Sequence, residues 1–113
     1  MSDVAPLRLG PVAPGLPSGA HATYRGRSGS NLAVLTAEAL PALSDGTTYQ
    51  AWAREEGQWV LLGTVAPYSD GTAHLIAENS ALVRAPDAVE ITIESAGGSQ
   101  TPSDAVVLRW LPT

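Results

Sequence analysis

The chain has 113 residues, and its six cations, all of them Arg, stand against eleven Asp and Glu, which gives a net charge of -5. It contains no Cys, no Phe and no Lys, so a disulfide framework, a thiolate zinc site and a cysteine nucleophile are excluded. The acidic balance argues against nucleic acid and anionic membranes as partners, because both are bound by clustered positive charge.

The length predicts a single domain with one hydrophobic core. No run of apolar residues approaches the roughly 20 that a membrane-spanning helix needs. The first residues, Met1 to Val4, are not a basic segment followed by an apolar run, so no secretory signal is expected.

Residues 1–19 hold four of the nine prolines, at positions 6, 11, 14 and 17. Proline fixes φ and has no amide hydrogen, which disfavours helices and internal strands. We therefore expect residues 1–19 to form an extended lead-in or tether, in which Leu7 and Leu9 could pair only against a sheet edge. The folded domain is expected over residues 20–113.

From residue 20 onward, short apolar runs alternate with turn residues, as in an all-β domain. Residues 89–95 alternate most clearly, because three apolar side chains face one way and Glu90, Thr92 and Glu94 face the other. We expect the apolar face to be buried and the polar face to be solvated. A short helical turn is expected over residues 79–82. Strands are predicted over residues 22–25, 32–39, 47–54, 58–66, 72–77, 89–95 and 105–111. This pattern predicts a small antiparallel β-sandwich of about seven strands with an immunoglobulin-like architecture.

Few residues suggest chemistry. His21 and His74 lie far apart, with no carboxylate near either at ligand spacing, so no metal site is predicted. The two Asp-Gly-Thr triplets, at 45–47 and 70–72, each carry one acid, which fits a turn better than a calcium loop. The Glu55–Glu56 pair is expected at a solvated hairpin tip. We expect a protein that is not an enzyme and that uses no cofactor.

The three Trp residues allow two interpretations. Because the chain has no Phe, its Trp and Tyr side chains must supply much of the bulk of the core. Alternatively, Trp59 and Trp110 form a ligand face on which sugars or peptides stack, which would require exposed and coplanar rings. The residues alone therefore leave a sensory β-domain and a carbohydrate- or ligand-binding module as alternatives.

Residues 40–52, LPALSDGTTYQAW, resemble the "L-P-x-L-x-x-G-x-x-Y-Q-x-W" stretch of the C-terminal domain of anti-sigma-K factors. Residues 89–102, VEITIESAGGSQTP, are similar to the "hydrophobic strand, E-x-x-G-G-S-x-x-P" signature of the same family. The signature is structural: Tyr49 and Trp52 are expected to fill a core strand, whereas Gly97, Gly98 and Pro102 shape a hairpin loop.

The resemblance implies an extracytoplasmic sensory or regulatory domain without catalytic residues. Proteins of this family hold a sigma factor through a cytoplasmic domain and cross the membrane once, and regulated proteolysis releases the sigma factor. The partners implied are a site-1-type protease or another extracytoplasmic regulator, with the sigma factor bound only through a domain absent from this chain. Two alternatives stay open: an excised extracytoplasmic domain whose residues 3–19 are the juxtamembrane tether, or a stand-alone ligand- or carbohydrate-binding relative.

Overall fold

Eight strands and one short 3-10 helix make up the fold in the computed structural model, which describes residues 6–27 and 29–112. The all-β prediction is confirmed, and the expected helical turn is present as η1 after the cap residue Asn79. The elements are β1 (Leu7–Pro11), β2 (His21–Gly26), β3 (Leu32–Glu38), β4 (Thr47–Glu55), β5 (Gln58–Val65), β6 (Ala73–Glu78), η1 (Ser80–Val83), β7 (Ala88–Ser95) and β8 (Val106–Trp110).

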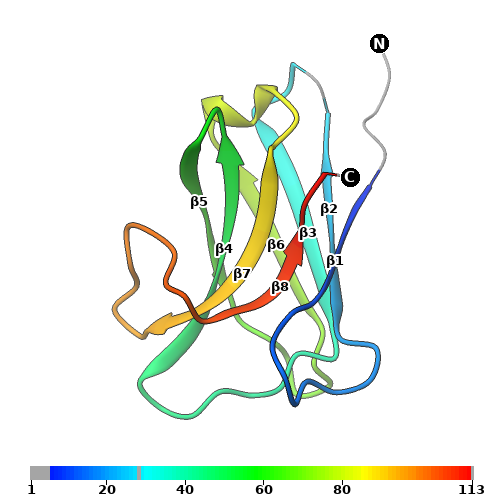
Figure 1. The fold of residues 1–113 in the computed structure, drawn as a ribbon, viewed down its shortest axis with the longest axis vertical. Coiled ribbons are helices and arrows are strands. Elements are labelled where there is room, and N and C mark those ends of the chain that lie inside the picture. Colours follow the sequence, from blue (N-terminus) through cyan, green and yellow to red (C-terminus); the bar gives the residue numbers. More distant parts are fainter. Residues whose placement is uncertain (1–5, 28, 113) are drawn as a thin grey trace.

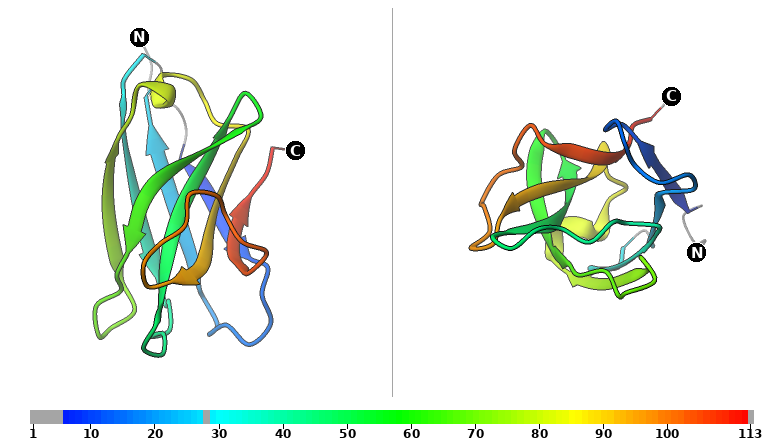
Figure 2. Two further views of the ribbon diagram at one scale, coloured as in Figure 1. Left: turned by 90° about the vertical axis from the view of Figure 1, so that its left-hand side faces the viewer. Right: turned by 90° about the horizontal axis from the view of Figure 1, so that it is seen from below.

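The eight strands form one antiparallel sheet in the order β5-β4-β7-β8-β1-β2-β3-β6. The sheet curls until its two edge strands, β5 and β6, face each other, so the molecule is nearly a barrel (Figures 1 and 2). The predicted immunoglobulin-like sandwich of about seven strands differs from this arrangement. The described residues contain one more strand than predicted, and that strand joins the two halves of the sheet.

The additional strand is β1, which lies inside the segment expected to be a tether. Its first three residues pair with β2, and Gly10 and Pro11 pair with β8. Leu9 is completely buried in the core. The expected domain boundary at residue 20 is therefore wrong for residues 7–11, while residues 1–5 lie outside the described part of the chain. Proline does not prevent this strand because Pro6 precedes it and Pro11 ends it, so no proline interrupts its interior.

The seam between β5 and β6 depends on a glycine. Gly63 in β5 has a φ of +150°, and a Cβ there would stand 2.9 Å from Leu75 Cδ1 of β6. The missing side chain lets the two edge strands approach each other closely, because backbone and not side chain faces Leu75. The barrel is thereby nearly closed although no hydrogen-bonded pairing joins these two edges.

The core lies inside the curled sheet and is rich in alanine. Alternate residues of each strand point inward, so every strand contributes one or more buried apolar side chains. The small alanine side chains leave room for the larger ones, since interiors pack densely. The largest fully buried members of this core are Tyr24, Tyr49, Leu9, Ile91, Leu108, Val65 and Val89.

The predicted Asp-Gly turns are present. Asp70 Oδ1 accepts hydrogen bonds from the amide of Thr72 at 3.0 Å and from its hydroxyl at 2.7 Å. These two bonds lower the pKa of the Asp70 carboxyl, because they favour its charged form. The Asp70 side chain thus stabilises the turn between β5 and β6, as expected for an Asp that precedes a turn glycine.

Candidate functional site

The residues that carry the family resemblance come together on the outer face of β4 and β7. They are far apart in sequence, yet hydrogen bonds link them beneath the loop of residues 96–105, which connects β7 to β8. Figure 2 shows this loop in orange, folded across β4. We call this group the signature cluster and define it as Gln50, Trp52, Thr92, Glu94, Gly98, Ser99 and Ser103.

Tyr49 begins the motif on the inner face. Its ring is buried in the core, and its hydroxyl donates a hydrogen bond to the carbonyl oxygen of Pro41 at 2.7 Å. Burial raises the pKa of this hydroxyl, because the charged phenolate is disfavoured away from water. The bond joins β4 to the connection that precedes it, which explains why Leu-Pro and Tyr occur in one motif.

Trp52 is buried as predicted, but on the opposite face from the expected one. Inward positions of β4 are Tyr49, Ala51 and Ala53, so Trp52 points outward and is not part of the core, although it is 0% exposed. Three positions separate Tyr49 from Trp52, and an odd spacing places two strand residues on opposite faces. Trp52 therefore belongs to a second buried layer, outside the sheet.

The indole of Trp52 starts a chain of hydrogen bonds across this outer layer. Its Nε1 donates to Thr92 Oγ1 at 2.9 Å, and the Thr92 hydroxyl donates to Glu94 Oε2 at 2.5 Å. Glu94 Oε2 also accepts from the amide of Ser103 at 2.8 Å. Each buried donor thus has an acceptor, which is what burial of polar groups requires.

A second connection fixes the tip of the same loop. Gln50 Oε1 accepts a hydrogen bond from the amide of Ser99 at 3.0 Å. Gly98 has a φ of +85°, and a Cβ there would lie 3.2 Å from Gln50 Nε2. Glycine is required at this position both for its backbone conformation and for the close approach of Gln50. The predicted loop-shaping role of Gly98 is consistent with this geometry, as is the place of Gly97 and Pro102 in the same loop.

The outer layer also holds an ion pair between a buried carboxylate and a partly exposed arginine. Glu90 is buried and accepts a hydrogen bond from Arg109 Nε of β8 at 3.1 Å. Glu90 lies opposite Trp52 in the register of β4 and β7. The charged residues that looked like a solvated strand face in the sequence are in fact covered. The hydrogen bonds of the signature cluster hold the loop of residues 96–105 on the sheet.

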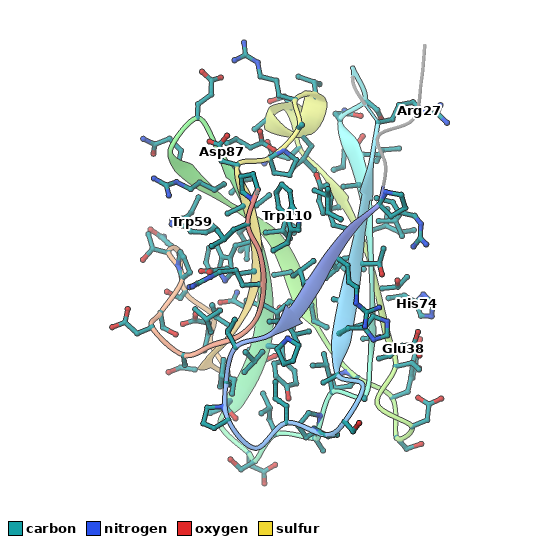
Figure 3. All side chains as sticks on the ribbon, turned by 45° about the vertical axis from the view of Figure 1, so that its right-hand side comes forward. Arg27, Glu38, Trp59, His74, Asp87 and Trp110 are labelled. Carbon is teal, nitrogen blue, oxygen red and sulfur yellow. The ribbon has the colours of Figure 1, made fainter. Side chains whose placement is uncertain are left out.

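The two rings of the predicted ligand face do not lie on one face of the sheet. Trp59 lies opposite Arg54 on the outer side of the sheet, and the Arg54 guanidinium is 6.0 Å from the centre of the Trp59 ring. Trp110 lies opposite the inward-facing Val89 and packs against the core (Figure 3). The structure therefore does not bring Trp59 and Trp110 together as a stacking platform.

The two histidines both lie on the outer side of the half-sheet formed by β2, β3 and β6. His21 contacts Glu38 at 3.6 Å and the carbonyl oxygen of Gly19 at 2.8 Å, and His74 lies exposed opposite Thr36. In the part of the chain that the structure describes, no group of three or more His, Cys, Asp or Glu is placed to hold a metal ion.

Glu55 is a feature that the sequence did not reveal. It was expected at a solvated hairpin tip, but it ends β4 on an inward-facing position and is only 6% exposed. Its Oε2 has no hydrogen-bond partner. Burial raises the pKa of this carboxyl to about 7, and the nearby carboxylates of Asp87 and Glu56 add to the effect while Arg84 opposes it. Strand alternation from Tyr49 through Ala53 could have indicated its inward position.

Replacing Thr92 with Val tests the signature cluster. The substitution keeps the shape of the side chain but leaves the buried indole N–H of Trp52 without an acceptor, so we expect a loss of about 1–3 kcal/mol in the free energy of unfolding. Urea denaturation followed by circular dichroism measures it. Thr64→Val, on the exposed outer face of β5, is the matched control and should change stability by less than about 0.5 kcal/mol. Equal losses in the free energy of unfolding for Thr92→Val and Thr64→Val would contradict a stabilising role of the Trp52–Thr92 hydrogen bond.

Replacing Glu55 with Gln tests the buried carboxyl. Between pH 4.5 and pH 7 the folded state holds a proton on Glu55 that the unfolded state has lost, so this residue lowers the free energy of unfolding as pH rises through that range. Glu55→Gln removes that penalty. We expect the variant to be more stable than the native protein by about 1–3 kcal/mol at pH 8, with the difference shrinking toward pH 5. Thermal unfolding at several pH values, with the exposed Glu78→Gln as control, measures it, and a pH-independent difference would contradict it.

The comparison with protein families supports the resemblance that the motifs of residues 40–52 and 89–102 indicated. The family model described as "Anti-sigma-K factor rskA, C-terminal" matches residues 4–107. Neither the curated proteins nor the solved structures give a significant match to the chain. The matched range begins before β1 and ends within β8, so it includes strands β1 to β7 and the first two residues of β8. The chain belongs to the family of anti-sigma-K factor C-terminal domains.

Proposed function

We propose that this chain is the extracytoplasmic sensory or regulatory domain of a transmembrane anti-sigma factor. In this proposal it acts without catalysis and controls the release of a sigma factor through regulated proteolysis. The family match over residues 4–107 supports a regulatory domain of an anti-sigma factor. No helix among the described residues is long and apolar enough to cross a membrane. The sigma factor would be held by a separate domain of the parent protein.

The observation that carries the mechanism is the position of β1. Its residues are paired with β2 on one side and with β8 on the other, and Leu9 is completely buried. A protease binds its substrate as an extended segment whose backbone and side chains are accessible. A cleavage site within β1, or close before it, is therefore protected as long as the sheet holds this strand.

In this proposal, the signal changes how often β1 detaches from its neighbours β2 and β8. A signal that loosens the sheet would release β1 and expose the adjoining chain to a site-1-type protease or a comparable extracytoplasmic protease. The β1 pairing is short, with three register positions on β2 and two on β8, so its opening requires fewer hydrogen bonds to break than unfolding of the whole sheet.

The alternative of a stand-alone ligand- or carbohydrate-binding domain has less support. That function was tied to exposed, coplanar Trp rings, and Trp59 and Trp110 lie on opposite sides of the sheet. We therefore retain the regulatory proposal.

Leu9→Ala in the membrane-anchored parent protein tests this mechanism. Truncating this buried side chain should lower the free energy of unfolding by about 2–5 kcal/mol. The open population then rises by about 30-fold or more, and cleavage of the parent before the domain should rise with it. Immunoblotting of the cleaved parent, together with a sigma-dependent reporter, measures both steps. Arg8→Ala, which changes the neighbouring exposed residue of β1, is the matched control and should leave cleavage unchanged.

A destabilised Leu9→Ala domain that is cleaved at the same rate as the native protein would refute shielding by β1. The stability of the variant is measured separately on the 113-residue chain. That measurement shows whether the substitution has loosened the fold, independently of the result for cleavage.

A further inference from the structure

Three aliphatic side chains lie exposed on the outer face of β3 and β6, which pair side by side (Figure 1). Leu32 is 46% exposed, Val34 is 38% exposed and Ile76 is 71% exposed. Leu32 and Val34 alternate with the buried Ala33 and Leu35 of β3, and Val34 stands directly opposite Ile76 in the register of the two strands. The three exposed side chains therefore adjoin one another, and we call them the β3–β6 patch.

The β3–β6 patch differs from the outer face of the other half of the sheet. There the loop of residues 96–105 is hydrogen-bonded onto β4 and β7 and covers the signature cluster. The aliphatic side chains of the patch remain in contact with water, which is unfavourable for large apolar groups. A surface of adjoining exposed apolar side chains is typical of a site at which another molecule docks.

A groove of about 490 Å³ adjoins the patch on the side of β2, and Leu32 and Val34 line it. Arg25 of β2, which stands opposite Val34 in the register, also lines it, as does Arg27 where β2 leads into β3. Figure 3 shows Arg27 at the upper end of these strands. Arg25, Val34 and Ile76 thus form a row across β2, β3 and β6, with a cation at one end and two aliphatic side chains beside it.

The groove is cationic although the chain carries a net charge of -5. None of the described residues that line it is Asp or Glu. Ion pairs elsewhere in the molecule are made by His21, Arg84 and Arg109. Within residues 6–27 and 29–112, the Arg25 guanidinium has no carboxylate partner, so its hydrogen-bond donors are available to an acidic group from outside.

The charges at the border of the patch limit the kind of partner. Glu38 and Glu78 lie on the same outer face, at opposite ends of the paired strands. Nucleic acid or an anionic membrane would meet these carboxylates as well as Arg25, and both are bound by clustered positive charge. A single carboxylate next to apolar groups can reach Arg25 without meeting Glu38 or Glu78. Repulsion by the net charge of the chain is screened beyond about 8–10 Å at physiological salt, so the direct contact with Arg25 dominates.

The dimensions of this surface fit an extended peptide. Arg25, Val34 and Ile76 lie on three neighbouring strands, which are about 4.8 Å apart. In an extended peptide, the side chains at positions i, i+2 and i+4 point to the same side and span about 13 Å. One acidic and two aliphatic side chains at these positions can therefore cover the row from the Arg25 guanidinium to Ile76. Arginine is also enriched in protein–protein interfaces.

We propose that the groove and the β3–β6 patch bind an extended segment of a partner protein, which carries one Asp or Glu and two aliphatic side chains on the same side of its backbone. The carboxylate pairs with Arg25, and the aliphatic side chains cover Val34 and Ile76. A small anion would reach only Arg25 and would leave the patch exposed. The inference goes beyond the proposed function, since it concerns a surface of β2, β3 and β6 and does not depend on the opening of β1.

NMR titration of the ¹⁵N-labelled 113-residue chain at pH 7.5 tests the proposal. The probe is the peptide acetyl-Glu-Thr-Ile-Thr-Ile-amide, whose Glu and Ile side chains share one side in the extended conformation. We expect saturable shifts of the amides of Leu32, Val34 and Ile76. Peptides with Gln in place of Glu, or with Ala in place of both Ile residues, should bind about threefold more weakly or worse, since each lacks one part of the contact.

Exchanging the charge of Arg25 gives the sharpest comparison. Arg25→Glu should weaken binding of the acidic peptide by about fivefold or more, because attraction becomes repulsion. The same variant should prefer acetyl-Lys-Thr-Ile-Thr-Ile-amide, whereas the native chain should prefer the acidic peptide. A preference that reverses with the charge cannot result from damage to the fold.

Two further variants test the apolar contact and provide the control. Ile76→Ser should weaken binding by about threefold or more, because it removes an aliphatic side chain that the peptide covers. Arg54→Ala, which changes an exposed arginine on the outer face of β4, is the matched control and should leave the affinity unchanged.

The proposal is overturned if the acidic peptide gives no saturable shifts, if Arg25→Glu and the native chain bind it equally, or if sodium acetate or sodium phosphate alone shifts Ile76 to the same extent. It is also overturned if another occupant takes the surface. The same shifts on concentrating the chain without peptide would assign the surface to a second copy. Peptide binding about tenfold tighter in a chain that lacks residues 1–5 would assign it to this chain's own N-terminal segment.

Discussion

Strand β1 is shared between two neighbours, and the continuity of the sheet depends on it. Residues 7–9 pair with β2, and residues 10 and 11 pair with β8, so five residues join the two halves of the structure. Without β1 the sheet would split into β5-β4-β7-β8 and β2-β3-β6, with Leu9 removed from the core of both. Because hydrophobic burial and strand pairing both require β1, its release would also break the continuous sheet that forms the nearly closed barrel.

The signature cluster stabilises another part of the sheet, namely strands β4 and β7. Strand β4 carries core residues on its inner face and the hydrogen-bonded layer of Gln50 and Trp52 on its outer face. The loop of residues 96–105 covers that outer layer, so β4 and β7 are buried on both sides. In the sheet, β8 separates β7 and β4 from β1, the strand whose opening we propose to be regulated. A local change at β1 therefore need not disturb β4 and β7.

Several elements could be predicted from the sequence because their signals are local. The alternation of residues 89–95, the Asp-Gly turn at 70–71 and the helical turn after Asn79 each depend on neighbouring residues, and all three are present. The motif residues Gln50, Trp52 and Gly98 could be singled out by resemblance, but their partners lie 40 or more positions away. The spacing of residues along the sequence does not show which residues become such long-range hydrogen-bond partners.

The predictions that differ from the structure failed for equally specific physical reasons. Proline content suggested a tether over residues 1–19, but the positions of Pro6 and Pro11 at the ends of β1 matter more than their number. Trp52 was assigned to the core because it is large and apolar, although strand alternation from Tyr49 places it outside. Glu55 was assigned to solvent because acids are usually exposed, whereas alternation places it inside, at the end of the barrel.

Native-state hydrogen exchange of the 113-residue chain tests the central role of β1 most directly. The free energies of opening are compared between the hydrogen-bonded amides of β1 and those of β2 and β8, and the amides of β4 and β7 report global unfolding. If β1 holds the two halves together, the amides that pair with it should become exposed when it opens, and the opening free energies of β1, β2 and β8 at these positions should agree within about 1 kcal/mol. Exchange of β1 many orders of magnitude faster than that of its partners on β2 and β8 would contradict the account, because β1 would then be a loosely attached lead-in and not a joining strand.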